Sequence, residues 1–494
     1  MQCHPWSTVR MTTSPETASR RPPDSPPSAP DGPTGQLVTW VSELARDQIP
    51  DRVYERACHL ILDGLGCALV GAQLPWSRVA TSAVLAIEGA GDATVIGTGH
   101  TTTPAGAALL NSTYIQGFEL DDFHPTAPLH SASVLIPSLL ATGTQLGDRV
   151  SGRDLLIAAI AGFETGPRVG AALGGTEMLS RGWHSGPIFG GIAAAVACGK
   201  LRGSSRAVLE DSVGFAATQS AGLMSAQYEA MGKRMQHGFA ARNGFYAAAL
   251  AHAGYTGIDQ VLERPYGGFL PVYGEGHHPD AEAITRDLGT LWETERIMVK
   301  SWAVMGGLHG AVEAARTLRE RLAGRAIERI DIRVGDVVYH HGWWPAERPL
   351  TAIGGQMNIG YATAVTLLDG IALPEQFTDQ RLDDDDVWNL LNRTHVEHDR
   401  TIDTLPVELR FQTHVTLTLS DGTRETTSVI APHGNPTDPV TNDEVVAKFR
   451  SLVTRVLPTE RVAAIEHSVL DLPNVDDVTP LIDLLGAPAG RALD

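Results

Sequence analysis

Small and aliphatic residues recur at helical spacing across the first half of the chain, and no other feature constrains the fold as much. Residues 53–72, VYERACHLILDGLGCALVGA, place apolar side chains every three or four positions. Residues 191–201 and 240–255 are rich in alanine and glycine, whose small side chains let helices pack closely. The pattern predicts a large all-helical domain over residues 36–284.

The pattern changes after about Asp280. Residues 325–340, RAIERIDIRVGDVVYH, alternate apolar and polar side chains and predict a strand that follows a helix over 308–323. Residues 406–430 predict a β-hairpin that turns at Asp421-Gly422. These elements predict a smaller α/β domain, inserted as a lid over residues 285–435.

The two ends of the chain differ from each other. Residues 1–35 are rich in proline, serine and threonine without helical period, which predicts a disordered tail. The tail lacks the apolar stretch of a secretory signal. Residues 436–494 predict a helical return to the first domain. The predicted fold class is therefore mainly α, a large all-helical domain with a smaller inserted α/β lid domain.

Charge limits the classes of partner. The formal net charge is −19, and a phosphate footprint needs clustered lysine and arginine, so no nucleic acid and no anionic membrane is expected. No run of 18 apolar residues occurs, so no membrane span is expected either. We predict a cytoplasmic protein that binds a small molecule.

Cofactor motifs are missing from the sequence. The cysteines form no CxxC pair and no metal-ligand spacing, and two of them lie in an apolar helical stretch that predicts burial in the core. No HxH or HExxH spacing, no GxGxxG, no P-loop and no GxSxG elbow occurs in a supporting context. We therefore expect no metal and no organic cofactor. The four cysteines are Cys3, Cys58, Cys67 and Cys198.

Acids and imidazoles crowd into one segment, FELDDFHPTAPLHSASVLIPSLLA, at residues 118–141. Such groups at a helix junction suit proton transfer, because their proximity spreads their pKa values. The alternative is that Asp122 or Ser131 only caps the helix expected to begin near Ser133. The carboxylates are Glu119, Asp121 and Asp122, and the histidines are His124 and His130.

A basic cluster follows in MGKRMQHGFAARNG, at residues 231–244. Its charged side chains stand among small and apolar residues, which favours a packed interior that needs an anionic partner. The alternative is a helix start at the surface with ordinary solvated charges. The cluster consists of Lys233, Arg234, His237 and Arg242.

Three further positions are candidates for a site. His184 precedes a glycine-bearing helix start, where backbone N–H groups can receive an anion, although a lone histidine there is more often structural. Lys300 and His309 flank a Gly-Gly turn. Tyr339, followed by two histidines, ends the predicted strand, and sites often lie at such ends.

The order of these motifs resembles the MmgE/PrpD family from about Val38 onward. The motifs are DD…H, then WHSG before an alanine-rich helix, then KRMQHGFAARNG, then K followed by GGLHG. The resemblance implies a helical domain with an α/β lid domain, a homodimer, and no metal or organic cofactor. It also implies a site between the two domains, built from His130, His184, Lys233, Tyr339 and the acidic group Glu119–Asp122.

Two details depart from the family pattern or stay open. Met305 stands five residues after Lys300, where many relatives carry cysteine or histidine. Lys233 and Arg234 are adjacent, and the sequence does not say which of them takes the role of the family lysine.

The implied function is a cofactor-free lyase that decarboxylates cis-aconitate to itaconate. His130, Tyr339, Lys233 and Asp122 are the expected catalytic residues, with His130 the first choice of proton donor and Tyr339 the second. The alternatives are a hydro-lyase like 2-methylcitrate dehydratase, an epimerase of the same fold, and a non-catalytic tricarboxylate-binding protein that only Met305 supports. The expected substrate-binding residues are His184, Arg234, His237, Glu119, Asp121, Lys300 and His309.

Overall fold

The structure is a computed structural model that describes residues 22, 25–147 and 150–493. Residues 1–21 and 23–24 of the predicted disordered tail lie outside the described residues. Part of the remaining segment contacts the protein: the backbone N of Ser28 donates to Glu210 at 2.8 Å, and helix α1 (Pro33–Glu43) begins before the predicted boundary at Gly35.

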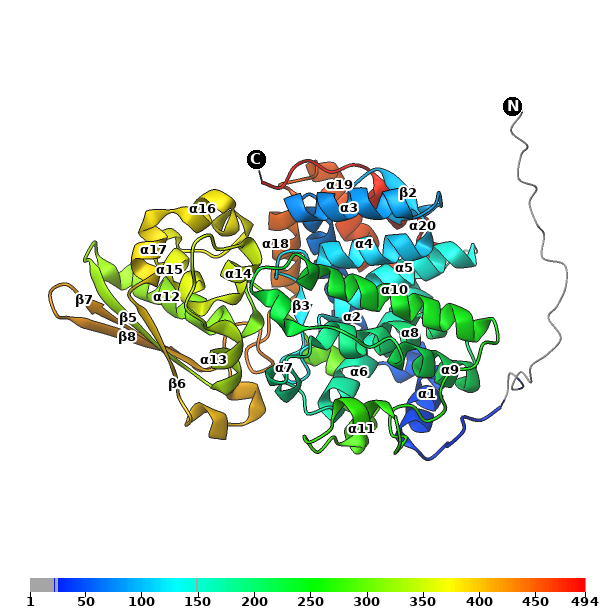
Figure 1. The fold of residues 1–494 in the computed structure, drawn as a ribbon. Coiled ribbons are helices and arrows are strands. Elements are labelled where there is room, and N and C mark those ends of the chain that lie inside the picture. Colours follow the sequence, from blue (N-terminus) through cyan, green and yellow to red (C-terminus); the bar gives the residue numbers. More distant parts are fainter. Residues whose placement is uncertain (1–21, 23–24, 148–149, 494) are drawn as a thin grey trace, which may run out of the picture.

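The larger part of the molecule is a bundle of helices, which confirms the prediction of a mainly α fold (Figure 1). Helix α10 packs against α4, α8 and α9, while α6 packs against α8. Gly244 of α10 lies so close to α8 that a Cβ there would overlap Ala194, so its lack of a side chain permits the contact. The helices are α2 (Asp51–Gly71), α3 (Pro75–Ile87), α4 (Pro104–Ile115), α5 (Ser131–Leu146), α6 (Gly152–Ala172), α7 (Glu177–Ser180), α8 (Gly191–Leu201), α9 (Arg206–Ala217), α10 (Gly232–His252) and α11 (Phe269–Tyr273).

Local signals explain where several helices begin. The Thr103 side chain accepts from the backbone N of Gly106, and proline follows it at the start of α4, as the Thr-Pro signal predicts. Ser151 caps α6 in the same way by accepting from the N of Asp154. Cys58 and Cys67 are buried in α2, as expected.

The second part, which we call the α/β unit, runs from α12 to β8 and occupies the left side of Figure 1. Its four-stranded sheet has the order β6-β5-β7-β8, with β5 parallel to β6 and antiparallel to β7. Alternate residues of β7 are buried, and α12 packs against β7 and β8, so one face of the sheet is covered. The elements are α12 (His309–Leu322), α13 (Asp336–Gly342), α14 (Ala352–Met357), α15 (Ile359–Asp369), α16 (Asp379–Asp383), α17 (Asp385–Leu391), β5 (Ile327–Val334), β6 (Thr394–His398), β7 (Thr413–Leu419) and β8 (Arg424–Val429).

The hairpin predicted at Asp421-Gly422 is confirmed by β7 and β8. The strand predicted over 325–340 is only partly correct, because β5 ends at Val334 and α13 follows. The carboxylate of Asp403 accepts from the backbone N of Asp336 at 2.8 Å, which stabilises the start of this helix. Tyr339 therefore lies within a helix and not at a strand end.

The C-terminal helices pack against the helical bundle. Helices α18 (Asn442–Val453) and α19 (Thr459–Leu470) pack on α2, and α20 (Thr479–Gly486) packs on α19. Lys448 of α18 forms an ion pair with Asp63 of α2 at 2.7 Å. The start of the α/β part lies later than the predicted residue 285, because β4 (Met298–Val299) pairs with β3 (Asp122–Phe123) in the bundle. A further short pair joins β1 (Ala93–Val95) and β2 (His100–Thr102).

Within residues 25–147 and 150–493, no single helix has the length and apolar character needed to cross a bilayer. The pair α2 and α3 meets both conditions only when taken together, and the two helices are bent by 86°.

Candidate functional site

A pocket lies where the helical bundle meets the α/β unit. The space that it encloses, open solvent included, is about 550 Å³. Both parts of the molecule supply its walls. The bundle and the segment after it contribute Glu119, Phe123, Pro128, His130, Thr176, Leu179, His184, Ser185, Met224, Lys233 and Lys300, and the α/β side contributes Met305, Gly306, Gly307, Val337, His341, Met357 and Phe411.

Two lysines share one carboxylate at the polar end of the pocket. Nζ of Lys233 lies 2.5 Å from Oε1 of Glu119, and Nζ of Lys300 lies 3.0 Å from Oε2 of the same carboxylate. Burial raises the pKa of Glu119, but the two lysines and His130 outweigh burial and hold that pKa well below its usual value. Since a single carboxylate serves both ammonium groups, they can also bind an anion in the pocket.

Glu119 has a backbone conformation that side-chain-bearing residues rarely adopt. Its φ is 58°, in the left-handed region, at a typical cost of about 1–3 kcal/mol. The preceding backbone is held on both sides: Arg234 Nε donates to the carbonyl of Gly117 at 2.5 Å, and Gln356 Nε2 donates to that of Phe118 at 2.7 Å. These contacts fix the position in which Glu119 meets the lysines.

Arg234 itself lies outside the pocket lining. Besides Gly117 it donates to Gln356 Oε1 at 2.9 Å, and its guanidinium lies 4.2 Å from the ring centroid of Trp76. The sequence-based expectation that Arg234 binds substrate is therefore not what this geometry favours. Of the adjacent basic pair, Lys233 faces the pocket and Arg234 holds the backbone beside Glu119.

His130 lines the pocket and forms a second polar pair with Asp121, which is buried outside the pocket lining. Nδ1 of His130 lies 3.1 Å from Oδ2 of Asp121, and 12% of the histidine side chain is exposed. An ionised carboxylate only accepts hydrogen bonds, so Nδ1 of His130 carries the proton in this contact. Nε2 is then the ring nitrogen that can take up and release a proton. Asp121 Oδ1 also lies 4.0 Å from Nζ of Lys300, which links this pair to the lysine pair.

His184 lines the pocket in a defined tautomer. Gln236 donates through Nε2 to the carbonyl of Leu223 at 3.1 Å, so its Oε1 faces His184 and accepts from Nδ1 at 2.7 Å. Burial and the charge of Lys233 hold the pKa of His184 well below its usual value. His184 is thus neutral, with the lone pair of Nε2 available.

His237 lies behind these two histidines instead of in the pocket. Its ring centroid is 5.0 Å from that of His130 and 4.8 Å from that of His184, with edge-on contacts. Gly186 allows this packing, because a Cβ at that position would overlap the ring. Neither ring nitrogen of His237 has a hydrogen-bond partner among the described residues, and burial and the neighbouring histidines lower its pKa strongly.

Three other predicted site residues also lie away from the pocket lining. Asp122 accepts from the backbone N of Ala132 at 3.1 Å and so stabilises the start of α5, which is the capping alternative. His309 is fully buried at the start of α12, and burial and the charge of Lys300 lower its pKa to about 3. Tyr339 stacks on His398 at a centroid distance of 5.9 Å.

His341, noted from the sequence only as one of the two histidines after Tyr339, lines the pocket. It lines the pocket together with Val337, one helical turn earlier on α13. Burial, followed by the charge of Lys233, lowers its pKa to about 4, and its Nε2 has no partner in the described part of the chain. If residues 336–342 are taken as a helix, Val337 and His341 lie on the same face of it, because they are four residues apart.

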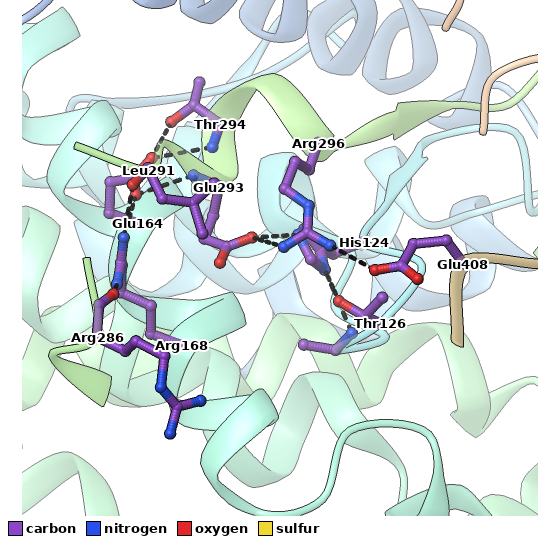
Figure 2. A network of polar contacts seen from close by, with 11 residues as sticks. His124, Thr126, Glu164, Arg168, Arg286, Leu291, Glu293, Thr294, Arg296 and Glu408 are labelled. Carbon is purple, nitrogen blue, oxygen red and sulfur yellow. Dashed lines mark hydrogen bonds and ion pairs between the residues drawn. The ribbon is translucent and has the colours of Figure 1, made fainter. Parts of the chain in front are cut away.

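His124, from the same segment as Glu119 and His130, joins a different network (Figure 2). Its Nε2 lies 3.0 Å from Glu293, which also contacts Arg296 at 3.2 Å. Glu164 of α6 accepts from the backbone of Glu293 at 3.0 Å. The network joins α6 to the chain that leads into the α/β unit, so His124 has a structural role beside the pocket.

Metal-ligand side chains converge elsewhere. Among the described residues, the one group of three or more such side chains with converging ligand atoms is Asp336, His340 and His398, on the α/β unit outside the pocket lining.

Comparison with known proteins covers almost the whole chain. Residues 35–282 match the MmgE/PrpD N-terminal domain, and residues 302–472 match the MmgE/PrpD C-terminal domain. The chain is 46% identical to the cis-aconitate decarboxylase-like protein oryM of Aspergillus oryzae, over 92% of this chain and 97% of that protein. It is 42% identical to a cis-aconitate decarboxylase of Aspergillus terreus, over 94% and 98% of the two chains. The human cis-aconitate decarboxylase is 25% identical over 92% of this chain and 95% of its own.

Proposed function

This chain belongs to the MmgE/PrpD family, and from that membership we propose that it is a carboxy-lyase that converts cis-aconitate to itaconate and CO2. The observation that carries the proposal is identity of 42–46% over nearly the full length to fungal proteins named for this activity. The pocket supports it, because its lining combines lysines and histidines with apolar side chains.

The reaction needs one proton and no electron acceptor. The bond between the methylene carbon and its carboxylate breaks, and its electron pair forms the new terminal C=C bond. The original double-bond pair shifts to the carbon next to another carboxylate, and that carbon takes a proton. The cis-aconitate trianion plus one proton thus gives the itaconate dianion and CO2.

Lys233 and Lys300 hold the two carboxylates that stay on the product. Their shared partner Glu119 keeps both ammonium groups in place, so their charge is oriented before substrate arrives. The departing carboxylate faces the apolar wall formed by Phe123, Met305 and Met357, where loss of charge as CO2 is favoured. His184 adds a neutral imidazole and His341 a second one.

His130 delivers the proton. Asp121 orients its ring through Nδ1 and leaves Nε2 to act on the substrate carbon. Its partial exposure lets solvent restore the proton after each turnover. Tyr339, the second choice from the sequence, does not line the pocket and has no part in this scheme.

The test incubates tag-free protein with cis-aconitate in D2O and follows the products by NMR. We expect itaconate with one deuterium on its saturated methylene carbon, together with CO2. A parallel incubation with 2-methylcitrate should leave that acid unchanged. Formation of citrate or isocitrate without CO2 would establish a hydro-lyase instead, and lack of any turnover would contradict the proposed enzyme.

The family membership and the pocket also support a lid and a dimer. The pocket is lined from both parts of the molecule, so the α/β unit acts as a lid over the helical bundle. The homodimer forms through the exposed apolar side chains of Phe239, Tyr246 and Leu250, which lie along α10 and are 40%, 44% and 41% exposed. Light scattering should give twice the chain mass, and Phe239→Glu with Leu250→Glu should give monomers. The cytoplasmic location stays a prediction.

A further inference from the structure

We propose that the α/β unit binds a divalent transition-metal ion of the zinc class at a site separate from the pocket, with Asp336, His340 and His398 as ligands. One ligand atom from each residue lies within 4.8 Å of the other two. His340 Nε2 is 3.3 Å from Asp336 Oδ1, and His398 Nε2 is 4.0 Å from the same oxygen.

These distances suit a small ion. Ligands bound at about 2.0–2.2 Å in a tetrahedron lie roughly 3.3–3.6 Å apart, so one pair already has the required spacing. The other pairs need shifts of under about 1.5 Å, which partly exposed side chains can make; His340 is 60% exposed and Asp336 is 44% exposed. Two imidazoles and one carboxylate favour Zn²⁺, Co²⁺ or Ni²⁺ over the oxygen-seeking Ca²⁺ and Mg²⁺.

The surrounding residues orient the ligands. Asp336 and His340 are one turn apart on α13, and His398 ends the neighbouring strand β6. The ring of Tyr339 stacks on His398 and meets His340 edge-on at a centroid distance of 5.2 Å. This arrangement gives Tyr339 a role that the reaction does not supply: its ring packs against both imidazole ligands.

Asp403 contacts two of the three ligand residues, Asp336 and His398. Its Oδ1 accepts from the backbone N of Asp336 at 2.8 Å, and its Oδ2 accepts from Nε2 of His398 at 2.5 Å. An ion bound to Nε2 of His398 would replace the proton in the second of these hydrogen bonds, while the first bond holds the start of α13 in place.

The ion would fix α13 to β6 without taking part in the reaction. Val337 and His341 of α13 face the pocket, whereas Asp336 and His340 meet His398 outside it. Stabilising α13 therefore stabilises one wall of the pocket. The sequence could not reveal the site, since His398 lies far along the chain from the helical pair.

The test uses the full-length, tag-free protein after treatment with EDTA, titrated with Co²⁺ and followed by its visible absorption. We expect saturable binding of one Co²⁺, displacement by Zn²⁺, and a rise in Tm with Zn²⁺ by mass action. His340→Gln and His398→Gln should each weaken binding at least about tenfold, since even indirect partners of a metal are worth about 10–100-fold. His395→Gln, an exposed histidine of the same strand, should bind as wild type does.

Three results would overturn the proposal. They are absence of saturable Co²⁺ binding, equal binding by wild type and both ligand variants, and loss of binding in His395→Gln. Circular dichroism checks that each variant is folded, and the three substitutions lie at partly or fully exposed positions. Turnover of the EDTA-treated protein gives an independent readout, and we expect it to be retained because the ion lies outside the pocket lining.

Discussion

The ammonium of Lys233 lies 2.5 Å from the Glu119 carboxylate, with both side chains 2% exposed, although the two residues are far apart in the sequence. Lys300 contacts the other oxygen of the same carboxylate. Charges this deeply buried are retained only when they are paired, and breaking such a pair is costly. The triad therefore couples the stability of the fold to the capacity of the pocket to bind an anion.

Lys233→Met should lower both stability and activity. We expect a loss of about 3 kcal/mol in the free energy of unfolding, because the substitution leaves Glu119 with one lysine. We also expect kcat/KM to fall roughly 30- to 1000-fold, the usual cost of losing one buried charged contact to substrate. The double variant Lys233→Met with Glu119→Gln separates the two effects. It should recover much of the stability but none of the activity, and recovery of kcat/KM would exclude Lys233 from substrate binding.

Arg234 should behave differently from its neighbour. Arg234→Met removes the donors to Gly117 and Gln356 and so loosens the strained backbone at Glu119. We expect a drop of about 2–4 kcal/mol in unfolding free energy, typical of unpaired buried polar groups. Citrate should still raise the Tm of this variant, whereas it should do so far less for Lys233→Met. Equal losses of the citrate effect in both variants would place Arg234 in direct contact with the ligand.

His130→Ala should lower kcat by about 10²–10⁴, the usual contribution of a general acid, with little change in Tm. Asp121→Asn should produce a smaller loss, because it keeps the ring but removes the acceptor that fixes its tautomer. Steady-state kinetics of the two variants and Tm measurements check this ranking. Wild-type kcat in folded His130→Ala would assign the proton to another group.

Stability should fall as the pH is lowered from 6.5 toward 3, partly because of His309. Burial and the charges of Lys300 and Lys448 give it a pKa of about 3 in the folded protein, against about 6.5 in the unfolded chain. The unfolded state therefore binds the proton first, and acidification favours unfolding within this window until both states are protonated.

His309→Asn removes that contribution. Between pH 6 and pH 4, wild type should lose about 3 kcal/mol more unfolding free energy than the variant, following about 1.4 kcal/mol per pH unit. Urea unfolding at several pH values measures the difference. If the unfolding free energies of wild type and His309→Asn change in parallel with pH, the pKa of His309 is not lowered in the folded protein.

Much of the fold follows from local patterns in the sequence. The helical spacing, the caps at Thr103 and Ser151 and the hairpin turn at Asp421-Gly422 depend on residues within a few positions of one another. The boundary at Val334 is not evident from the sequence, because apolar residues continue past it at Val337 and Val338 and the start of α13 depends on a distant carboxylate, that of Asp403. The sequence pattern therefore predicts Tyr339 and its two following histidines at a strand end, and the family resemblance implies Tyr339 for the site, whereas His341 is the one of the three that lines the pocket.

The sequence by itself determined most of the helical segments, α13 excepted, and which short motifs carry the acids, imidazoles and lysines. Only the tertiary structure decided which member of each motif faces the pocket: Lys233 and not Arg234, His130 and not His124. Which side chain faces the pocket depends on how each segment is oriented in the packed molecule and on the residues of neighbouring elements that contact it. His398 shows the same limit, since packing of α13 against β6 brings it to His340, and no spacing along the chain encodes that contact.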